Sequence, residues 1–251
     1  MMTKASDQLS SSESTRSTGA VAKGIAAIAF AILFNIPFAI LASIYEYPDI
    51  LRRPAGEALD RFAAGGPFLI LTWYSFALAA LALVPLAIAL SITPSRIQNR
   101  PALAIGAALT GALAGVTQAI GLLRWVFAIP AIAEAHANSS ASAETRFAAE
   151  RAFDLLNSWG GVAIGEHLGQ LLTALFILLL SWLQWCERSR LTSLTGFAAV
   201  IAITLGTGEG LSLALGKSGD VFAVATIAGF LALTVWLILT GAGLIRSRDI
   251  A

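Results

Sequence analysis

The stretch Trp159-Gly-Gly-Val-Ala-Ile-Gly-Glu-His-Leu-Gly-Gln170 sets the pattern around which the rest of the chain is organised. Three glycines recur in it every four residues and therefore share one face of a helix, namely Gly161, Gly165 and Gly169. Such a face lets a neighbouring membrane helix approach closely. Glu166 and His167 lie in the same apolar run, where ionisable groups are costly and need a reason. The stretch predicts a membrane helix that combines a packing face with polar side chains.

The composition of the whole chain points to lipid as the main solvent. Of its 251 residues, 57% are apolar and only 12% are charged, and the mean hydropathy is +0.78. A soluble domain carries about 25% charged residues, so there is too little charge here to cover a soluble surface. The net charge of +1 gives no bulk attraction to nucleic acid. We therefore expect an all-α, polytopic membrane helix bundle whose main partner is the bilayer.

Six apolar stretches are long enough to cross a bilayer, which takes roughly 20 residues of helix. They cover about residues 20–45, 67–92, 102–132, 160–185, 194–215 and 221–245. The first run is longer than the apolar core of a signal peptide, which is about 7–15 residues, so we expect a retained span. The Ser/Thr-rich residues 1–19 predict a disordered tail, and residues 247–251 a short second tail. Residues 20–246 form one membrane domain.

The distribution of Lys and Arg predicts the orientation. One side of the membrane carries nine of them, which are Lys4, Arg16, Lys23, Arg96, Arg100, Arg188, Arg190, Arg246 and Arg248. The other side carries six, which are Arg52, Arg53, Arg61, Arg146, Arg151 and Lys217. The positive-inside rule therefore places both termini in the cytoplasm, and an even number of spans agrees with this.

The second long outer loop contains a pattern for a short amphipathic helix over about residues 142–157. Ser142 can cap its start, with Glu144 in the first turn. The helix either lies on the outer membrane interface or packs on the mouth of the bundle. The single cysteine, Cys186, is expected to be a free thiol.

Three spans place ionisable side chains at one level. Arg124, Glu166, His167 and Glu209 lie about six to eight residues from the outer ends of their spans, or roughly 9–12 Å inside that face. Gln118 and Gln170 lie somewhat deeper. An unpaired ion there is costly, so Arg124 is expected to face Glu166 or Glu209. This cluster is either an ion pair that fixes helix register or a polar pocket open to the outside that binds an anion or carries protons.

Other features support packing more than chemistry. Gly111 and Gly115 form a second small-residue pair in span three, which makes spans three and four candidate neighbours and brings Arg124 towards Glu166. Thr207-Gly-Glu-Gly210 either unwinds span five around Glu209 or packs closely. With one intramembrane histidine we expect no metal site and no cofactor, and there is no zinc-protease, serine-elbow or Walker motif.

Two segments carry a resemblance to a known family. They are Gln118-Ala-Ile-Gly-Leu-Leu-Arg-Trp-Val-Phe-Ala-Ile-Pro130 and Gly160-Gly-Val-Ala-Ile-Gly-Glu-His-Leu-Gly-Gln170. Together with six spans and this length, they resemble the bacterial membrane family catalogued as domain of unknown function 4386, over about residues 20–246. The resemblance implies a bacterial inner-membrane protein and supplies no catalytic residues.

The sequence leaves two main readings of function. The first is a small transporter-like or ligand-binding protein of a bacterial plasma membrane, in which the polar cluster takes a small molecule or a proton. The second is a structural or regulatory membrane subunit whose charges only fix packing, and whose glycine face also allows a homo-oligomer. An intramembrane enzyme is the weakest reading, because no nucleophile–base or metal set is present.

Overall fold

The computed structural model describes residues 2–246, with side chains from 18 to 219 and from 221 to 246. Within this part of the chain, six helices are long and apolar enough to cross a membrane. They are Thr18–Tyr45, Ala55–Ser91, Pro101–Ala137, Ala143–Cys186, Arg190–Ala214 and Val221–Arg246. These helices confirm the predicted all-helical protein with six membrane spans. Residues 247–251, predicted as a tail, lie outside the described residues.

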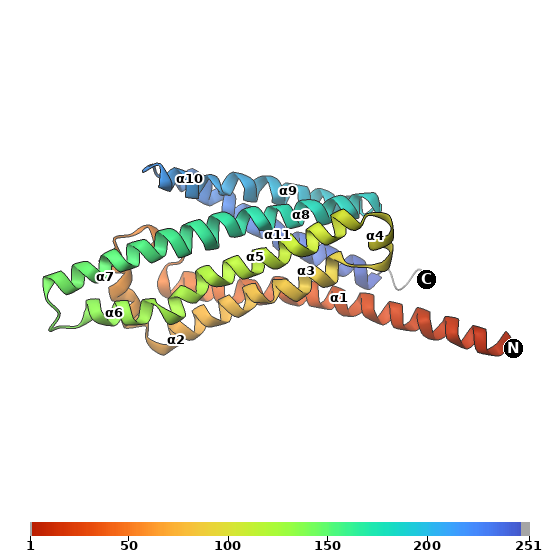
Figure 1. Ribbon diagram of the computed structural model, residues 1–251, viewed down its shortest axis with the longest axis horizontal. Coiled ribbons are helices and arrows are strands. Elements are labelled where there is room, and N and C mark those ends of the chain that lie inside the picture. Colours follow the sequence, from red (N-terminus) through yellow and green to blue (C-terminus); the bar gives the residue numbers. More distant parts are fainter. Residues whose placement is uncertain (1, 247–251) are drawn as a thin grey trace.

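Each span is built from one or more helical elements (Figure 1). In chain order they are α1 (Met2–Tyr45), η1 (Asp49–Arg52), α2 (Ala55–Leu81), α3 (Leu83–Ser91), α4 (Pro94–Asn99), α5 (Pro101–Phe127), α6 (Ile129–Ala137), α7 (Ala143–Leu156), η2 (Asn157–Leu168), α8 (Gly169–Cys186), α9 (Arg190–Gly206), α10 (Gly208–Ala214) and α11 (Asp220–Arg246). The helix α1 begins at Met2, whereas the sequence favours disorder for residues 1–19. That tail stays a prediction, because side chains before residue 18 are not described.

Spans two, three and four extend further at one end than the sequence predicts. The helix α2 begins at Ala55, within the expected loop, and bends at Gly66, whose φ of 60° is readily adopted only by glycine. The helix α5 breaks at Ala128, just before Pro130, and continues as α6. Proline cannot donate a helical hydrogen bond, which accounts for a break there. These extensions make the expected outer loops largely helical.

The segment predicted as a short outer helix is α7. Its N-cap is Ser142, whose hydroxyl oxygen accepts a hydrogen bond from the Thr145 amide at 3.2 Å. The helix packs on α6 and α2, and its buried residues are Ala149 and Phe153. The helix runs on into η2 and α8 along one line rather than turning across them (Figure 1). This arrangement matches packing on the end of the bundle rather than a helix lying flat on the interface.

The six spans form a closed ring in chain order. The helix α1 packs on α2, α2 and α3 on α5, and α5 on η2 and α8. The helix α8 then packs on α9, α9 on α11, and α11 returns to α1. Gly24 and Gly241 close the ring, since a Cβ atom on Gly24 would lie 2.6 Å from the Gly241 carbonyl oxygen. A ring of helices that each contact mainly their chain neighbours leaves its centre to be filled by side chains or by a cavity.

Two buried clusters fill the ends of this ring. One contains Phe176 and Trp236 and lies toward the end where α1 begins and α11 finishes. The other contains Tyr45, Trp73 and Trp125 and lies toward α6 and α7. In the second cluster, Trp73 and Trp125 stack with ring centroids 4.8 Å apart. The space between the two clusters is the candidate site.

Candidate functional site

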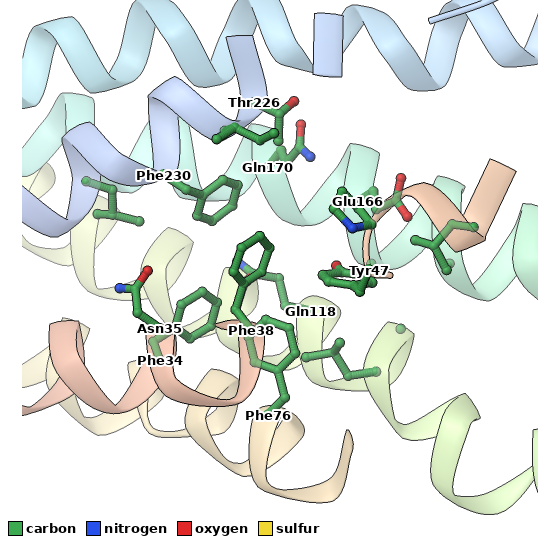
Figure 2. A pocket seen from close by; sticks show the side chains of 18 of the residues that line it. Phe34, Asn35, Phe38, Tyr47, Phe76, Gln118, Glu166, Gln170, Thr226 and Phe230 are labelled. Atoms are coloured by element: carbon green, nitrogen blue, oxygen red, sulfur yellow. The ribbon is translucent and has the colours of Figure 1, made fainter. Parts of the chain in front are cut away.

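A cavity of about 390 Å³ occupies the centre of the ring. Its walls come from α1, α2, α5, η2, α8 and α11, with η1 and α10 at one end. Most of the wall is apolar, and its aromatic members are Phe30, Phe34, Phe38, Tyr47, Trp73, Phe76, Trp125 and Phe230. Its polar members are Asn35, Asp49, Arg52, Gln118, Arg124, Glu166, Gln170, Glu209, Thr226 and Thr234. Figure 2 shows the phenylalanines grouped on one side and Glu166 with Tyr47 at the other.

The aromatic side of the cavity is a set of mutually packed rings. Phe34 lies 5.6 Å from Phe30 and 6.4 Å from Phe230 by ring centroid, and it meets Phe76 edge-on at 5.1 Å. These rings come from three spans that are distant in sequence. Near them the Asn35 side-chain amide donates to the Thr234 hydroxyl at 3.0 Å, which joins α1 to α11. The floor of the cavity is therefore apolar, with one polar link in its wall.

At the polar end of the cavity, Arg52 pairs with two carboxylates. The sequence patterns did not predict Arg52 as a site residue. Its Nη2 atom lies 2.7 Å from Glu166 Oε2 and 3.0 Å from Glu209 Oε1. Its Nε atom also donates to Glu209 Oε1 at 3.0 Å. Burial lowers the pKa of Arg52, but the adjacent carboxylates of Glu166 and Glu209 outweigh burial, so the net pKa shift is upward. One guanidinium thus joins η1 to η2 and α10.

The predicted pairing of Arg124 with these carboxylates differs from the structure. Arg124 is only 9% exposed. Its Nη1 atom donates to the Gly121 carbonyl oxygen, and its Nη2 atom donates to Asn157 Oδ1 at 3.0 Å. The Asn157 amide in turn donates to the Leu51 carbonyl oxygen at 3.2 Å. Arg124 therefore lies in the cavity wall and donates to neutral oxygens from Nη1 and Nη2, while Arg52 pairs with the two carboxylates.

The other predicted polar residues separate into two groups. Gln118 and Gln170 line the cavity together with Arg124, Glu166 and Glu209. The Gln118 amide donates to the Thr173 hydroxyl at 2.9 Å, which ties α5 to α8. His167 is not among the lining residues. Its Nδ1 atom lies 3.1 Å from the Thr207 carbonyl oxygen at the break between α9 and α10, and its ring lies against Gly210.

The predicted glycine face lies against α5. A Cβ atom on Gly161 would collide with the Arg124 guanidinium, and one on Gly169 would lie 2.9 Å from Gln118 Cγ. Gly165 touches the backbone of Gly121. The second predicted pair is divided between neighbours, because Gly111 faces Ala87 and Phe176 whereas Gly115 faces the Ala80 carbonyl. The glycines thus bring η2 and α5 together, which sets Arg124, Gln118, Glu166 and Gln170 in adjoining walls.

Neither the aromatic wall of the cavity nor the role of Arg52 was predicted from the sequence. Only the aromatic wall has a recognisable pattern in the sequence. Phe30, Phe34 and Phe38 recur every four residues in α1 and so share one face, with Asn35 beside them. That spacing could have suggested an aromatic wall. No comparable pattern indicates Arg52, because the sequence of a loop of mixed charge does not show which of its arginine side chains points into the cavity. Among the described side chains, from 18 to 219 and from 221 to 246, no group of three or more His, Cys, Asp and Glu residues is arranged to hold a metal ion.

A further polar cluster lies outside the cavity, where α2, α6 and α7 meet. The ring of His136 is 8% exposed by side chain and stands between two carboxylates. Its Nδ1 atom lies 2.9 Å from Asp60 Oδ1, and its Nε2 atom lies 3.1 Å from Glu150 Oε1. The two carboxylates approach opposite nitrogens of the ring, so the three residues form a chain that fastens three helices rather than a convergent site.

Comparison with known proteins identifies the family of this chain but no activity. Searches of curated proteins and of solved structures give no match. A family model described as "Domain of unknown function (DUF4386)" matches residues 22–241, which includes every residue of the cavity wall, the second to fifth spans in full and most of the first and sixth. The match confirms the resemblance carried by the Leu-Arg-Trp and Gly-Glu-His-Leu-Gly segments, and the chain belongs to the DUF4386 family of proteins of unknown function.

Proposed function

We propose that this protein binds a small molecule in the central cavity, as a transporter-like or ligand-binding membrane protein. The observation that carries this proposal is the cavity itself, of about 390 Å³ between six spans that close into a ring. Ligand sites have volumes of about 300–1,000 Å³ and are mostly apolar, with a few convergent polar groups. Phenylalanines on one side, with Arg52, Glu166 and Glu209 at the other, fit that description.

We further propose that the polar end of the cavity faces the outside of a bacterial plasma membrane, with both termini in the cytoplasm. The excess of Lys and Arg on the side of the termini supports this orientation. The side chains of Arg52, Glu166 and Glu209 are 27%, 25% and 16% exposed, so the polar end is partly open. The opposite end is closed by the buried cluster that contains Phe176 and Trp236. A ligand or a proton would therefore reach Glu166 and Glu209 from the outer side.

Access to the cavity can be measured with a single cysteine in a Cys186→Ser background. Thr226 lines the cavity, and Thr226→Cys nearly conserves volume. In spheroplasts we expect this cysteine to react from outside with two membrane-impermeant reagents, 2-(trimethylammonium)ethyl and 2-sulfonatoethyl methanethiosulfonate. Ala223→Trp, which fills the cavity from the same helix, should slow both reactions.

The matched control is Ala228→Cys, on the exposed face of the same helix and absent from the cavity wall. A thiol there lies in lipid and should stay unreactive, because the reactive thiolate is disfavoured in an apolar environment. If Thr226→Cys reacts no faster than Ala228→Cys, or reacts only when the inner face is exposed, the proposal of an outward-facing binding cavity is wrong.

The alternative, a structural or regulatory subunit, is favoured by one observation. Arg52 joins three separate elements through Glu166 and Glu209, which is also what a register-fixing ion pair would do. The glycine face gives this alternative no support through self-association, because Gly161, Gly165 and Gly169 face α5 inside the chain. An unreactive Thr226→Cys together with a large loss of stability in Arg52→Gln would favour the alternative.

A further inference from the structure

We propose that the cavity binds a lipophilic organic cation, whose charge takes the place of the Arg52 guanidinium between Glu166 and Glu209. The inference rests on the proposed function and names the chemical class of its ligand. The first argument is that this carboxylate pair already holds an organic cation, at 2.7 Å from Glu166 and 3.0 Å from Glu209. That cation belongs to the chain itself, so Arg52 acts as a tethered competitor for the site.

The second argument concerns which charged side chains of the cavity wall a ligand can reach. The carboxylate side chains of Glu166 and Glu209 are 25% and 16% exposed and line the cavity. Arg124, the other charged wall residue from a membrane span, is 9% exposed and donates to Gly121 and Asn157. A ligand that displaces Arg52 from the cavity therefore meets accessible negative charge, while the positive charge of Arg124 is held within the wall.

The third argument is the aromatic wall next to the carboxylates. Tyr47 lies beside Glu166 in Figure 2, and its ring meets Phe38 at 5.5 Å and Trp73 at 5.2 Å, both edge-on. The faces of aromatic rings attract organic cations, and ammonium ligands are commonly held in aromatic cages. Deeper in the cavity, Phe34, Phe76 and Phe230 offer an apolar floor for the uncharged part of such a ligand.

The fourth argument is that Arg52 can leave without breaking the fold around it. It is the last residue of η1, a single turn of four residues, and its side chain is 27% exposed. An arginine side chain has a long flexible stem that can carry its charged group into water. Ion pairs that are partly exposed contribute little net free energy, so exchange of one cation for another is inexpensive. The buried cluster around Tyr45, Trp73 and Trp125 includes Ile50 and Leu51 of η1 but not Arg52.

An anionic ligand is the competing assignment, and a different set of atoms would carry it. Trp73 Nε1, Trp125 Nε1 and Arg124 Nε are buried donors without a hydrogen-bond partner within the described chain, and all three residues line the cavity. An anion could satisfy them. These atoms are, however, buried away from solvent, whereas the side chains of Glu166 and Glu209 are partly exposed. The accessible chemistry therefore favours the cation.

The test uses two ions of the same shape and opposite charge, tetraphenylphosphonium and tetraphenylborate, with the full chain in nanodiscs of uncharged lipid. Binding is measured by equilibrium dialysis against empty nanodiscs. We expect the phosphonium ion to bind more tightly than the borate ion. Glu166→Gln combined with Glu209→Gln should weaken phosphonium binding by about tenfold or more, because both negative charges that attract the cation are lost.

The decisive variant is Arg52→Gln, which removes the tethered competitor. It should tighten phosphonium binding several-fold, whereas Arg52→Lys should leave the affinity near that of the unaltered chain. The matched control is Arg53→Gln, which removes the same charge from the next residue. Arg53 pairs with Glu46 and Glu57 and does not line the cavity, so phosphonium binding should not change. Size-exclusion profiles identify any variant that fails to fold. If Arg52→Gln fails to fold, the comparison of Arg52→Lys with the unaltered chain still tests the proposal.

Three results would overturn the assignment, and they separate it from the proposed function. Tighter binding of tetraphenylborate, weakened by Arg124→Gln and not by Arg52→Gln, would establish an anion site at Arg124 and leave the binding cavity in place. If neither ion binds above empty nanodiscs while Thr226→Cys reacts from outside, the cation assignment is wrong and the cavity stands. If neither ion binds and Thr226→Cys is unreactive, both proposals are wrong.

Discussion

Gly165 of η2 lies in backbone contact with Gly121 of α5. A Cβ atom on Gly165 would come 2.9 Å from the Gly121 Cα atom, and one on Gly121 would come 2.7 Å from the Gly165 Cα atom. No side chain separates the two helices at this point. Glu166 follows Gly165 directly, so the position of a cavity carboxylate depends on how closely the two backbones approach.

This contact predicts that Gly165→Ala destabilises the protein. The new methyl group must push α5 and η2 apart, and overpacking of this kind costs about 1–3 kcal/mol. Thermal unfolding in neutral detergent measures the loss. The control is Gly243→Ala in α11, where nothing lies within 4 Å of an added Cβ atom. That control should be neutral or slightly stabilising, because alanine is the better helix former. Equal melting temperatures for the two variants would contradict the close contact.

The ion pairs predict which arginine is coupled to Glu166. A double-mutant cycle with Arg52→Gln and Glu166→Gln should give a coupling free energy of about 1 kcal/mol, as expected for a partly exposed pair. The parallel cycle with Arg124→Gln should give a smaller value, since Arg124 donates to Gly121 and Asn157. Chemical or thermal unfolding of the five variants and the unaltered chain provides the comparison. A larger coupling for Arg124 would mean that it, and not Arg52, is the partner of Glu166.

The His136 chain predicts a local effect on the helical extension beyond the cavity. His136→Ala removes the link between Asp60 and Glu150 and should cost about 1 kcal/mol. Hydrogen exchange should rise in α6, α7 and the first turns of α2, and stay unchanged in α9 and α11. Arg151→Ala is the control, because its ion pair with Asp154 is 3.4 Å long and its side chain is 65% exposed. Uniform exchange changes across all spans would argue against a local fastening role.

Glu46, which directly follows α1, predicts a pH effect on the stability of residues 46–61. The hydrogen bond from Arg61, together with the charge of Arg53, holds the pKa of Glu46 below its usual value of 4.5. A carboxylate whose pKa is lowered by folding stabilises the fold above its unfolded pKa and loses that contribution as pH falls through the folded pKa. Limited proteolysis of residues 46–61 should therefore accelerate below about pH 4.5. In Glu46→Gln this acceleration should be smaller, and an unchanged pH profile would contradict the role of Glu46.

Several parts of the fold and site follow from local sequence. Apolar runs of span length predict six membrane helices, because a backbone in lipid must satisfy its hydrogen bonds within each helix. The depth expected for Glu166 and Glu209 rests on the rise of about 1.5 Å per helical residue, and it stays a prediction. The spacing of Gly161, Gly165 and Gly169 predicts a face for close packing, and that face lies on α5. These are properties of single helices, and single helices can be read from periodicity.

Pairing between distant residues was decided only by the tertiary structure. Arg52 lies 114 residues from Glu166 and 157 from Glu209, and their contact depends on the path of η1 and on the rotation of two other elements. Sequence reasoning assigned the carboxylates to Arg124 because it shares their depth. The rotation of α5 instead points that guanidinium at Gly121 and Asn157. The cavity likewise exists only because the six spans close into a ring, and ring closure is a relation between helices that no single helix encodes.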